Sequence, residues 1–103
     1  GMMDRIMQDE SLADMLIAVF IGDIPEQLDI LKNYIALDDI QKTERQAHSI
    51  KGACANIGGE AMRLAAYKME KFANSGDMEA VKSSMPQLEF EFERLKKVIM
   101  NSR

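Results

Sequence analysis

The 103-residue sequence is poor in several residue types, and each scarcity excludes a class of protein. It has one cysteine, Cys54, so an intramolecular disulfide is impossible and the chain fits a reducing compartment. No block of lysine and arginine stands out among the 13 basic and 17 acidic residues, which argues against nucleic acid as a partner. The longest apolar run covers residues 15–21, far below the roughly 20 residues that span a bilayer, so no direct membrane contact is expected.

What remains is the composition of one packed helical domain. Proline occurs twice and tryptophan not at all, while 47% of the residues are hydrophobic. Met, Leu and Ala are plentiful, and these side chains lose little entropy in a helix. The first residues lack the apolar core of a cleavable signal peptide. Gly1 precedes Met2 and resembles the scar of a removed tag, so we expect a single domain over residues 2–103.

Glycine, proline and helix-capping residues divide the chain into five predicted helices. In chain order these helices cover residues 9–22, 23–37, 38–57, 61–74 and 77–100, and a short helical turn is expected over residues 3–8. Gly22 closes the first helix, and Asp23 starts the second as an N-cap residue with Pro25 tolerated in the first turn. Pro86 lies inside the last helix, so a kink or break is expected between residues 83 and 86.

The apolar residues of these segments recur at helical spacing. The second predicted helix repeats them at steps of four and three, in Ile24, Leu28, Leu31 and Ile35. The last one does the same with Val81, Met85, Leu88, Phe92, Leu95 and Ile99. Short links between amphipathic helices make neighbours antiparallel. We therefore expect an all-α fold, an up-and-down antiparallel four-helix bundle with an additional N-terminal helix.

The only histidine, His48, falls on the third predicted helix at the edge of its core-facing stripe. On a wheel of about 100° per residue that stripe consists of Ile40, Ala47, Ile50, Cys54 and Ile57. His48 shares the neighbouring stripe with Lys51 and Gly52, so its imidazole should be partly exposed and supported by packing.

The two neighbours of His48 on that stripe each have a physical use. The ammonium of Lys51, one turn away, can attract an incoming phosphate. Gly52 costs up to about 1 kcal/mol relative to alanine inside a helix, and it leaves room beside the ring. Taken alone, these residues leave open that His48 is an ordinary polar surface residue.

The stretch from Ala47 to Gly58 resembles the signature of histidine phosphotransfer (HPt) domains. In that pattern a histidine is followed by lysine and glycine three and four places later, and by glycine at the tenth place; all four match here. The resemblance extends over almost the whole chain, including the Ser75-Gly76-Asp77 turn and the proline in the last helix.

This resemblance implies a role for each residue of the motif. His48 would carry a phosphoryl group on Nε2, Lys51 would stabilise that group, and Gly52 would clear space for it. Gly58 would end the helix close to its neighbour. Glu70 stands where some relatives have a glutamine that bonds the other ring nitrogen, so it is either a ring-orienting partner or a solvated glutamate.

The resemblance also implies a place in a two-component phosphorelay. The domain would accept a phosphoryl group on His48 from a receiver-domain aspartate and pass it to another receiver. Receiver domains of response regulators would be its partners, and the isolated domain would be monomeric. No cofactor is expected, because magnesium would belong to the receiver. The chain shows no Gly-rich phosphate loop, so it should be a carrier without its own ATP site and not an enzyme.

The parent protein and the docking surface are expected in outline. The domain would be a cytoplasmic module of a hybrid sensor histidine kinase, including one bound to a membrane; a chemotaxis-type kinase or a free-standing carrier are alternatives. Docking would use apolar residues around His48, with Leu12, Met15 and Val19 as candidates, although most of these three are expected in the core.

Three rival interpretations are weaker. The dimerisation and phosphoacceptor domain of a histidine kinase usually carries an acidic residue after its histidine, where this chain has Ser49. A helical adaptor without phosphotransfer would lack the histidine, which this chain retains. A metal-binding bundle is disfavoured because one histidine and one cysteine do not make a site.

Overall fold

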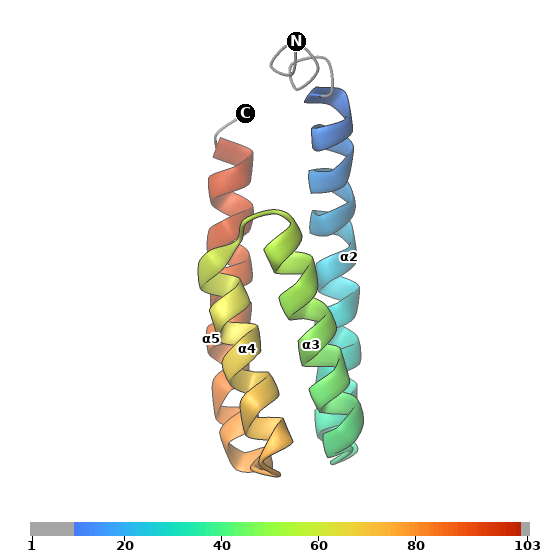
Figure 1. Ribbon diagram of the computed structural model, residues 1–103, viewed down its shortest axis with the longest axis vertical. Coiled ribbons are helices and arrows are strands. Elements are labelled where there is room, and N and C mark those ends of the chain that lie inside the picture. Colours follow the sequence, from blue (N-terminus) through green and yellow to red (C-terminus); the bar gives the residue numbers. More distant parts are fainter. Residues whose placement is uncertain (1–9, 102–103) are drawn as a thin grey trace.

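The computed structural model describes residues 10–101, and over that range the chain forms four α-helices and no strand. They are α2 (Glu10–Ala36), α3 (Ile40–Asn56), α4 (Glu60–Asn74) and α5 (Met78–Asn101). The helices run up and down, each antiparallel to the next (Figure 1). This confirms the all-α antiparallel bundle. In the described part of the chain, no helix has an apolar stretch able to cross a bilayer.

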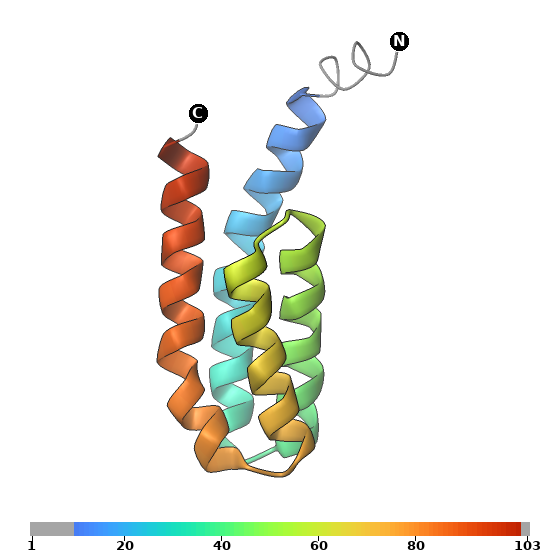
Figure 2. The same cartoon turned by 60° about the vertical axis from the view of Figure 1, so that its left-hand side comes forward.

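The bundle consists of two long and two short helices. α3 and α4 form a short hairpin that packs most extensively within itself, while α2 and α5 share fewer contacts. The turn between α3 and α4 lies partway along the two long helices, whose outer ends extend past it in both views (Figure 1, Figure 2). The long helices therefore have side chains that no other described helix covers.

The core is a single cluster to which every helix contributes one stripe. Its buried members are Phe20, Ile24, Leu28, Leu31, Ile35, Ala47, Ile50, Cys54, Met62, Ala65, Ala66, Met69, Ala73, Val81, Met85, Leu88 and Phe92. The predicted periodic positions of the second and last helices account for much of it. Burial raises the pKa of the Cys54 thiol to about 11, so this cysteine is an unreactive core residue.

One polar residue shares the core stripe of α3 and was not singled out from the sequence. Thr43 is completely buried, one turn before Ala47. Its hydroxyl donates to the carbonyl oxygen of Asp39 at 2.8 Å, which satisfies the buried polar group. The helical wheel alone could have placed it there, because residue 43 lies about 40° from Ala47.

The separation of residues 9–37 into two helices is wrong. α2 runs without interruption through Gly22 and Pro25, so no separate N-terminal helix precedes the bundle in residues 10–101; the expected turn over residues 3–8 lies outside the described residues. Phe20 and Ile24, one turn apart, are both buried on the same face. Burying each such side chain stabilises by about 1.5–3 kcal/mol, enough to offset the helix-breaking tendency of one glycine and one proline.

Of the kink or break expected between residues 83 and 86, the break does not occur, because α5 is continuous from Met78 to Asn101 and bends instead (Figure 2). The axis of its first turns is tilted relative to the rest, as the orange part of the ribbon shows (Figure 2). Ser84 donates its hydroxyl to the carbonyl oxygen of Val81 at 2.8 Å, whereas the carbonyl that Pro86 leaves without a helical donor is that of Lys82. Met85 and Leu88 are buried on either side of Pro86, so packing holds the helix together.

The capping aspartates and terminal glycines predicted from the sequence lie at helix ends in the structure. Asp39 accepts from the amide of Lys42 at 3.1 Å and caps α3, and Asp77 accepts from the amide of Ala80 at 3.0 Å before α5. Gly58 and Gly76 adopt positive φ angles of 74° and 79° after α3 and α4. Glycine enters this left-handed region without the steric penalty of a β-carbon.

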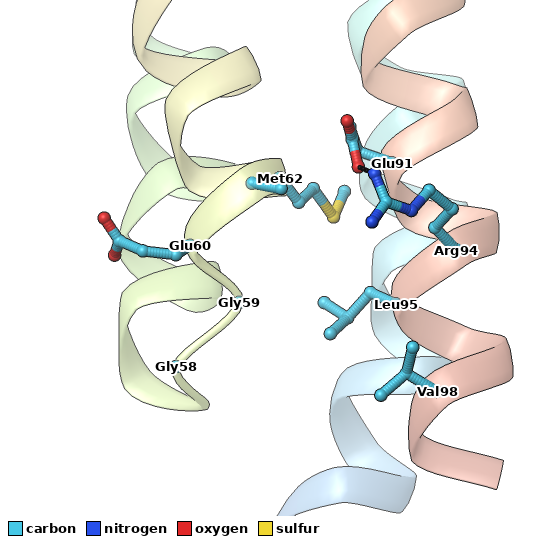
Figure 3. Close-up of a pocket in the computed structure, with 9 residues that line it drawn as sticks. Gly58, Gly59, Glu60, Met62, Glu91, Arg94, Leu95 and Val98 are labelled. Atoms are coloured by element: carbon cyan, nitrogen blue, oxygen red, sulfur yellow. Dashed lines mark hydrogen bonds and ion pairs between the residues drawn. The ribbon is translucent and has the colours of Figure 1, made fainter. Parts of the chain in front are cut away.

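The close approach that the resemblance implies for Gly58 belongs to Gly59. A β-carbon on Gly58 would meet nothing within 4 Å, whereas one on Gly59 would lie 2.7 Å from Cδ2 of Leu95 on α5. The Leu95 side chain points toward the glycine turn (Figure 3). The two adjacent glycines thus have different roles: Gly58 allows the chain to reverse direction, and Gly59 allows the α3–α4 hairpin to approach α5.

Gly59→Ala is therefore expected to destabilise the domain by about 1 kcal/mol, the low end for overpacking, because Leu95 can partly turn aside. Urea unfolding of the two proteins measures this difference. In a Leu95→Ala background the steric part should vanish, leaving only the smaller cost of alanine at the helix N-cap. An equal cost in both backgrounds would contradict the contact.

Candidate functional site

His48 lies on the outer side of α3, where its flanking residues fix the backbone. Ala47 and Ile50 are completely buried, while the His48 side chain is 65% exposed. The sequence places it correctly at the edge of the core stripe. An imidazole held by a packed helix and open to solvent is accessible to a partner without any rearrangement of the bundle.

A single carboxylate, that of Glu70 on α4, joins the two basic side chains of the site. Its Oε2 lies 2.9 Å from Nδ1 of His48, and its Oε1 forms an ion pair of 2.8 Å with Nζ of Lys51. The Glu70 and Lys51 side chains are 19% and 23% exposed, so the bridge is partly shielded from water. Met69, buried next to Glu70, anchors this part of α4 in the core.

The protonation of this bridge decides which ring nitrogen is reactive. Partial burial by itself would raise the pKa of Glu70, but the hydrogen bonds and charges of Lys51 and His48 outweigh it and keep that pKa below its ordinary value. The carboxylate is therefore ionised near neutral pH and can only accept. Nδ1 of His48 then carries the proton, and Nε2 of the neutral ring keeps its lone pair.

This bridge should give Glu70 a pH-dependent share in stability. Because its pKa is lowered on folding, the stabilisation is present above the ordinary value of 4.5 and is lost as the pH falls through the lower folded value. Urea unfolding of wild type and Glu70→Gln at about pH 5 and about pH 3 should show their stability difference shrinking toward acid. A difference that stays constant over this interval would contradict the bridge.

Gly52 lies one turn after His48 and is exposed. A β-carbon there would meet no atom within 4 Å, and the residue has no positive φ. The fold therefore does not require glycine at this position, although glycine costs the helix up to about 1 kcal/mol. Its missing side chain leaves open space beside the imidazole, in keeping with the role that the resemblance implies.

The three apolar candidates on α2 are not core residues, contrary to expectation. Leu12, Met15 and Val19 are 52–65% exposed. α3 ends at Asn56, too early to cover this part of α2, which the wheel of an isolated helix does not reveal. A groove of about 200 Å³ between α2 and α3 continues this surface, lined by Leu16, Val19, Phe20, Asp23, Ala53, Asn56 and Ile57.

One neighbour of the site was missed from the sequence. Tyr67 on α4 has the ammonium of Lys51 5.2 Å from the centre of its ring. Its position three residues before Glu70, on the same helix face, was the available signal. No three carboxylate, histidine or cysteine groups among residues 10–101 gather closely enough to hold a metal ion.

The exposed imidazole, the carboxylate that holds one of its nitrogens and the lysine beside it thus lie together on the outside of a four-helix bundle. Comparisons with known proteins define the family. The sequence model of the Hpt domain family matches residues 15–98. The chain belongs to the Hpt domain family.

Two relatives illustrate the match. The phosphorelay intermediate protein rdeA of Dictyostelium discoideum is 30% identical over 84 residues, which are 82% of this chain and 33% of that protein. The chain thus spans about a third of the length of this curated relative. The X-ray structure of a rice protein assigned as a histidine-containing phosphotransfer protein covers 90% of this chain and 69% of its own, with a TM-score of 0.71 and 17% identity. At that identity the likeness shows the fold.

Family membership sets the general function. The domain is a phosphocarrier domain of two-component signalling, the class that acts by histidine phosphotransfer. The part played by each residue is a separate question, which the geometry around His48 addresses.

Proposed function

We propose that His48 accepts a phosphoryl group from the aspartate of one receiver domain and passes it to the aspartate of another. One observation carries the assignment to His48. Its Nδ1 is held by the Glu70 carboxylate, whereas its Nε2 has no partner among the described residues. The His48 side chain is 65% exposed. The imidazole is thereby set with its nucleophilic nitrogen outward.

The transfer needs no proton to leave the ring. The lone pair on Nε2 attacks phosphorus, the Nε2–P bond forms, and the P–O bond to the aspartate breaks as the carboxylate leaves with its electron pair. Nδ1 keeps its proton, so the phosphorylated ring is a cation, and the ionised Glu70 beside it stabilises that charge. In the onward step a carboxylate oxygen of the second receiver's aspartate attacks phosphorus and forms a new P–O bond, while the Nε2–P bond breaks and its electron pair returns to Nε2.

Lys51 supplies the positive charge for the phosphoryl oxygens. In the structure its ammonium is held at Glu70, next to the ring and 23% exposed. An incoming phosphoryl group carries more negative charge than this one carboxylate and can draw the ammonium toward itself. We assign Gly52 to the clearance that lets the group and the docked receiver reach Nε2.

We further propose that the domain is a carrier without its own ATP site and without a cofactor. Magnesium would act on the receiver, where the aspartyl phosphate is formed and consumed. The exposed apolar residues Leu12, Met15 and Val19 would serve receiver docking by the monomeric domain. We place the domain in the cytoplasm, as a module of a hybrid sensor histidine kinase, with the cytoplasmic part of a membrane-bound kinase included.

The test is phosphoryl transfer from a receiver domain whose aspartate has been charged with ³²P-labelled acetyl phosphate and magnesium. The chain should take up label that is lost in acid and retained in base, the behaviour of phosphohistidine. Since the sequence has one histidine, such label, if it is absent from His48→Gln, identifies His48. Absence of label with every receiver of a broad panel would support a helical adaptor instead, and label that survives acid would place the phosphoryl group on a residue other than histidine.

A further inference from the structure

Two lysine ammonium groups lie over the ring of Tyr67 at the edge of the site. Nζ of Lys51 on α3 is 5.2 Å from the ring centre, and Nζ of Lys71, one turn further along α4, is 5.4 Å from it. Tyr67 is 39% exposed and is not a core residue. The ring therefore lies at the surface of the bundle, in contact with both ammonium groups.

Lys51 has two partners of different kinds. The Glu70 carboxylate holds it by an ion pair of 2.8 Å, which a phosphoryl group can replace. The Tyr67 ring attracts the ammonium through its face, and this attraction tolerates movement and persists when the carboxylate is exchanged for another anion. A lysine that must change partners without leaving the site is served by such a contact.

A second lysine–tyrosine pair elsewhere in the bundle shows what sets this one apart. Nζ of Lys42 lies 5.7 Å from the ring of Tyr34, but the Lys42 side chain is 58% exposed, against 23% for Lys51. Cation–π attraction is stronger where water is partly excluded. The ammonium beside His48 is thus the less exposed of the two, although its tyrosine ring is the more exposed, and the second pair provides a control for the loss of a lysine–tyrosine contact.

Building on the proposed function of His48, we propose that Tyr67 is a positioning residue for phosphoryl transfer. Its ring keeps the Lys51 ammonium beside His48 while that ammonium exchanges the Glu70 carboxylate for the oxygens of the phosphoryl group. Tyr67 does not touch the reacting atoms; it acts through Lys51. Its phenolic hydroxyl has no part in this role, so phenylalanine should replace it.

The experiment measures transfer from the charged receiver over a range of receiver concentrations. Tyr67→Leu, which keeps an apolar side chain without a π face, should lower the maximal rate about 3- to 10-fold and leave the half-saturating receiver concentration unchanged. Tyr67→Phe should stay within about two-fold of wild type. Tyr34→Leu, which removes the second lysine–tyrosine pair, should transfer as wild type does.

A double-mutant cycle identifies Lys51 as the residue through which Tyr67 acts. Lys51→Ala should slow transfer on its own, and adding Tyr67→Leu to it should cause no further loss. If the two substitutions reduce the transfer rate by factors that multiply in the double variant, or if Tyr67→Leu transfers as fast as wild type, the proposed role of Tyr67 is overturned.

A second measurement does not depend on the rates. Ring-current shifts of the Lys51 side-chain protons by NMR should vanish in Tyr67→Leu and persist in Tyr67→Phe, and shifts that persist in the leucine variant would overturn the proposal. A wild-type chain that takes no label would overturn the function of His48 and this role with it. A labelled wild type beside a fully active Tyr67→Leu would overturn only the role of Tyr67.

Discussion

His48→Gln is expected to abolish uptake of label from a charged receiver while leaving the bundle folded. Glutamine removes the nucleophilic nitrogen but keeps an amide N–H that can donate to Glu70, as Nδ1 does at 2.9 Å. Because the histidine side chain is 65% exposed, the change in unfolding free energy should be within about 0.5 kcal/mol. Labelling assays and urea unfolding on the same preparations measure the two effects.

Ser49→Ala is the matched control for this variant. Ser49 is the next residue of α3, is exposed, and belongs to neither the bridge nor the clearance beside the ring. It should label as wild type does. Label that persists in His48→Gln would place the phosphoryl group on another side chain, and the proposed mechanism would fail.

Gly52→Gln is expected to lower the transfer rate at least about 100-fold and at the same time to stabilise the domain. In a helix the bond from Cα to Cβ tilts toward the N-terminus, so a side chain at position 52 extends over His48, four residues earlier. Nothing in the fold opposes it, since a β-carbon at this position has no neighbour within 4 Å. The helix gains about 0.5 kcal/mol from losing a glycine, and the receiver loses access to Nε2.

Gly22 provides the matched control for this prediction. It too lies inside a helix, is exposed, and has open space around its missing β-carbon, but it belongs to α2. Gly22→Gln should stabilise the domain by a similar amount, and it serves as a control for stability alone because Gly22 continues the exposed stripe of Leu12, Met15 and Val19. Gly52→Ala, whose side chain is a single carbon, should transfer much faster than Gly52→Gln. If Gly52→Gln transferred normally, or if the alanine and glutamine variants lost activity equally, the clearance beside the imidazole would not be the reason for the glycine.

The sequence predicts the bundle well where helical periodicity and local punctuation agree. The core stripes of the second and last predicted helices are buried, and Asp39, Gly58, Gly76 and Asp77 mark helix ends in the structure. The prediction fails where a helix-breaking residue stands in a segment that tertiary packing keeps helical. Gly22 and Pro86 resemble breaks, yet buried side chains on both sides of each carry the helix through.

The sequence predicts only those features of the site that depend on a single helix, and misses those that depend on how the helices pack together. The edge position of His48 and the open space at Gly52 follow from one helix, so a wheel reveals them. The Lys51–Glu70–His48 bridge and the Tyr67 ring depend on the register between α3 and α4, which spacing along one helix does not specify. The exposure of Leu12, Met15 and Val19 depends on where α3 ends relative to α2, and this too is a tertiary property.

The residues of the proposed site all lie on the short hairpin of α3 and α4, whereas the exposed apolar residues Leu12, Met15 and Val19 lie on α2. On the proposed function, the residues that react and the residues that select the receiver therefore belong to separate stretches of sequence. Substitutions on the outer face of α2 would then exchange one receiver for another while the nucleophile, its carboxylate and its lysine stay as they are. A phosphorelay built on this domain can be rewired, or insulated from a neighbouring pathway, without any retuning of the chemistry at the histidine.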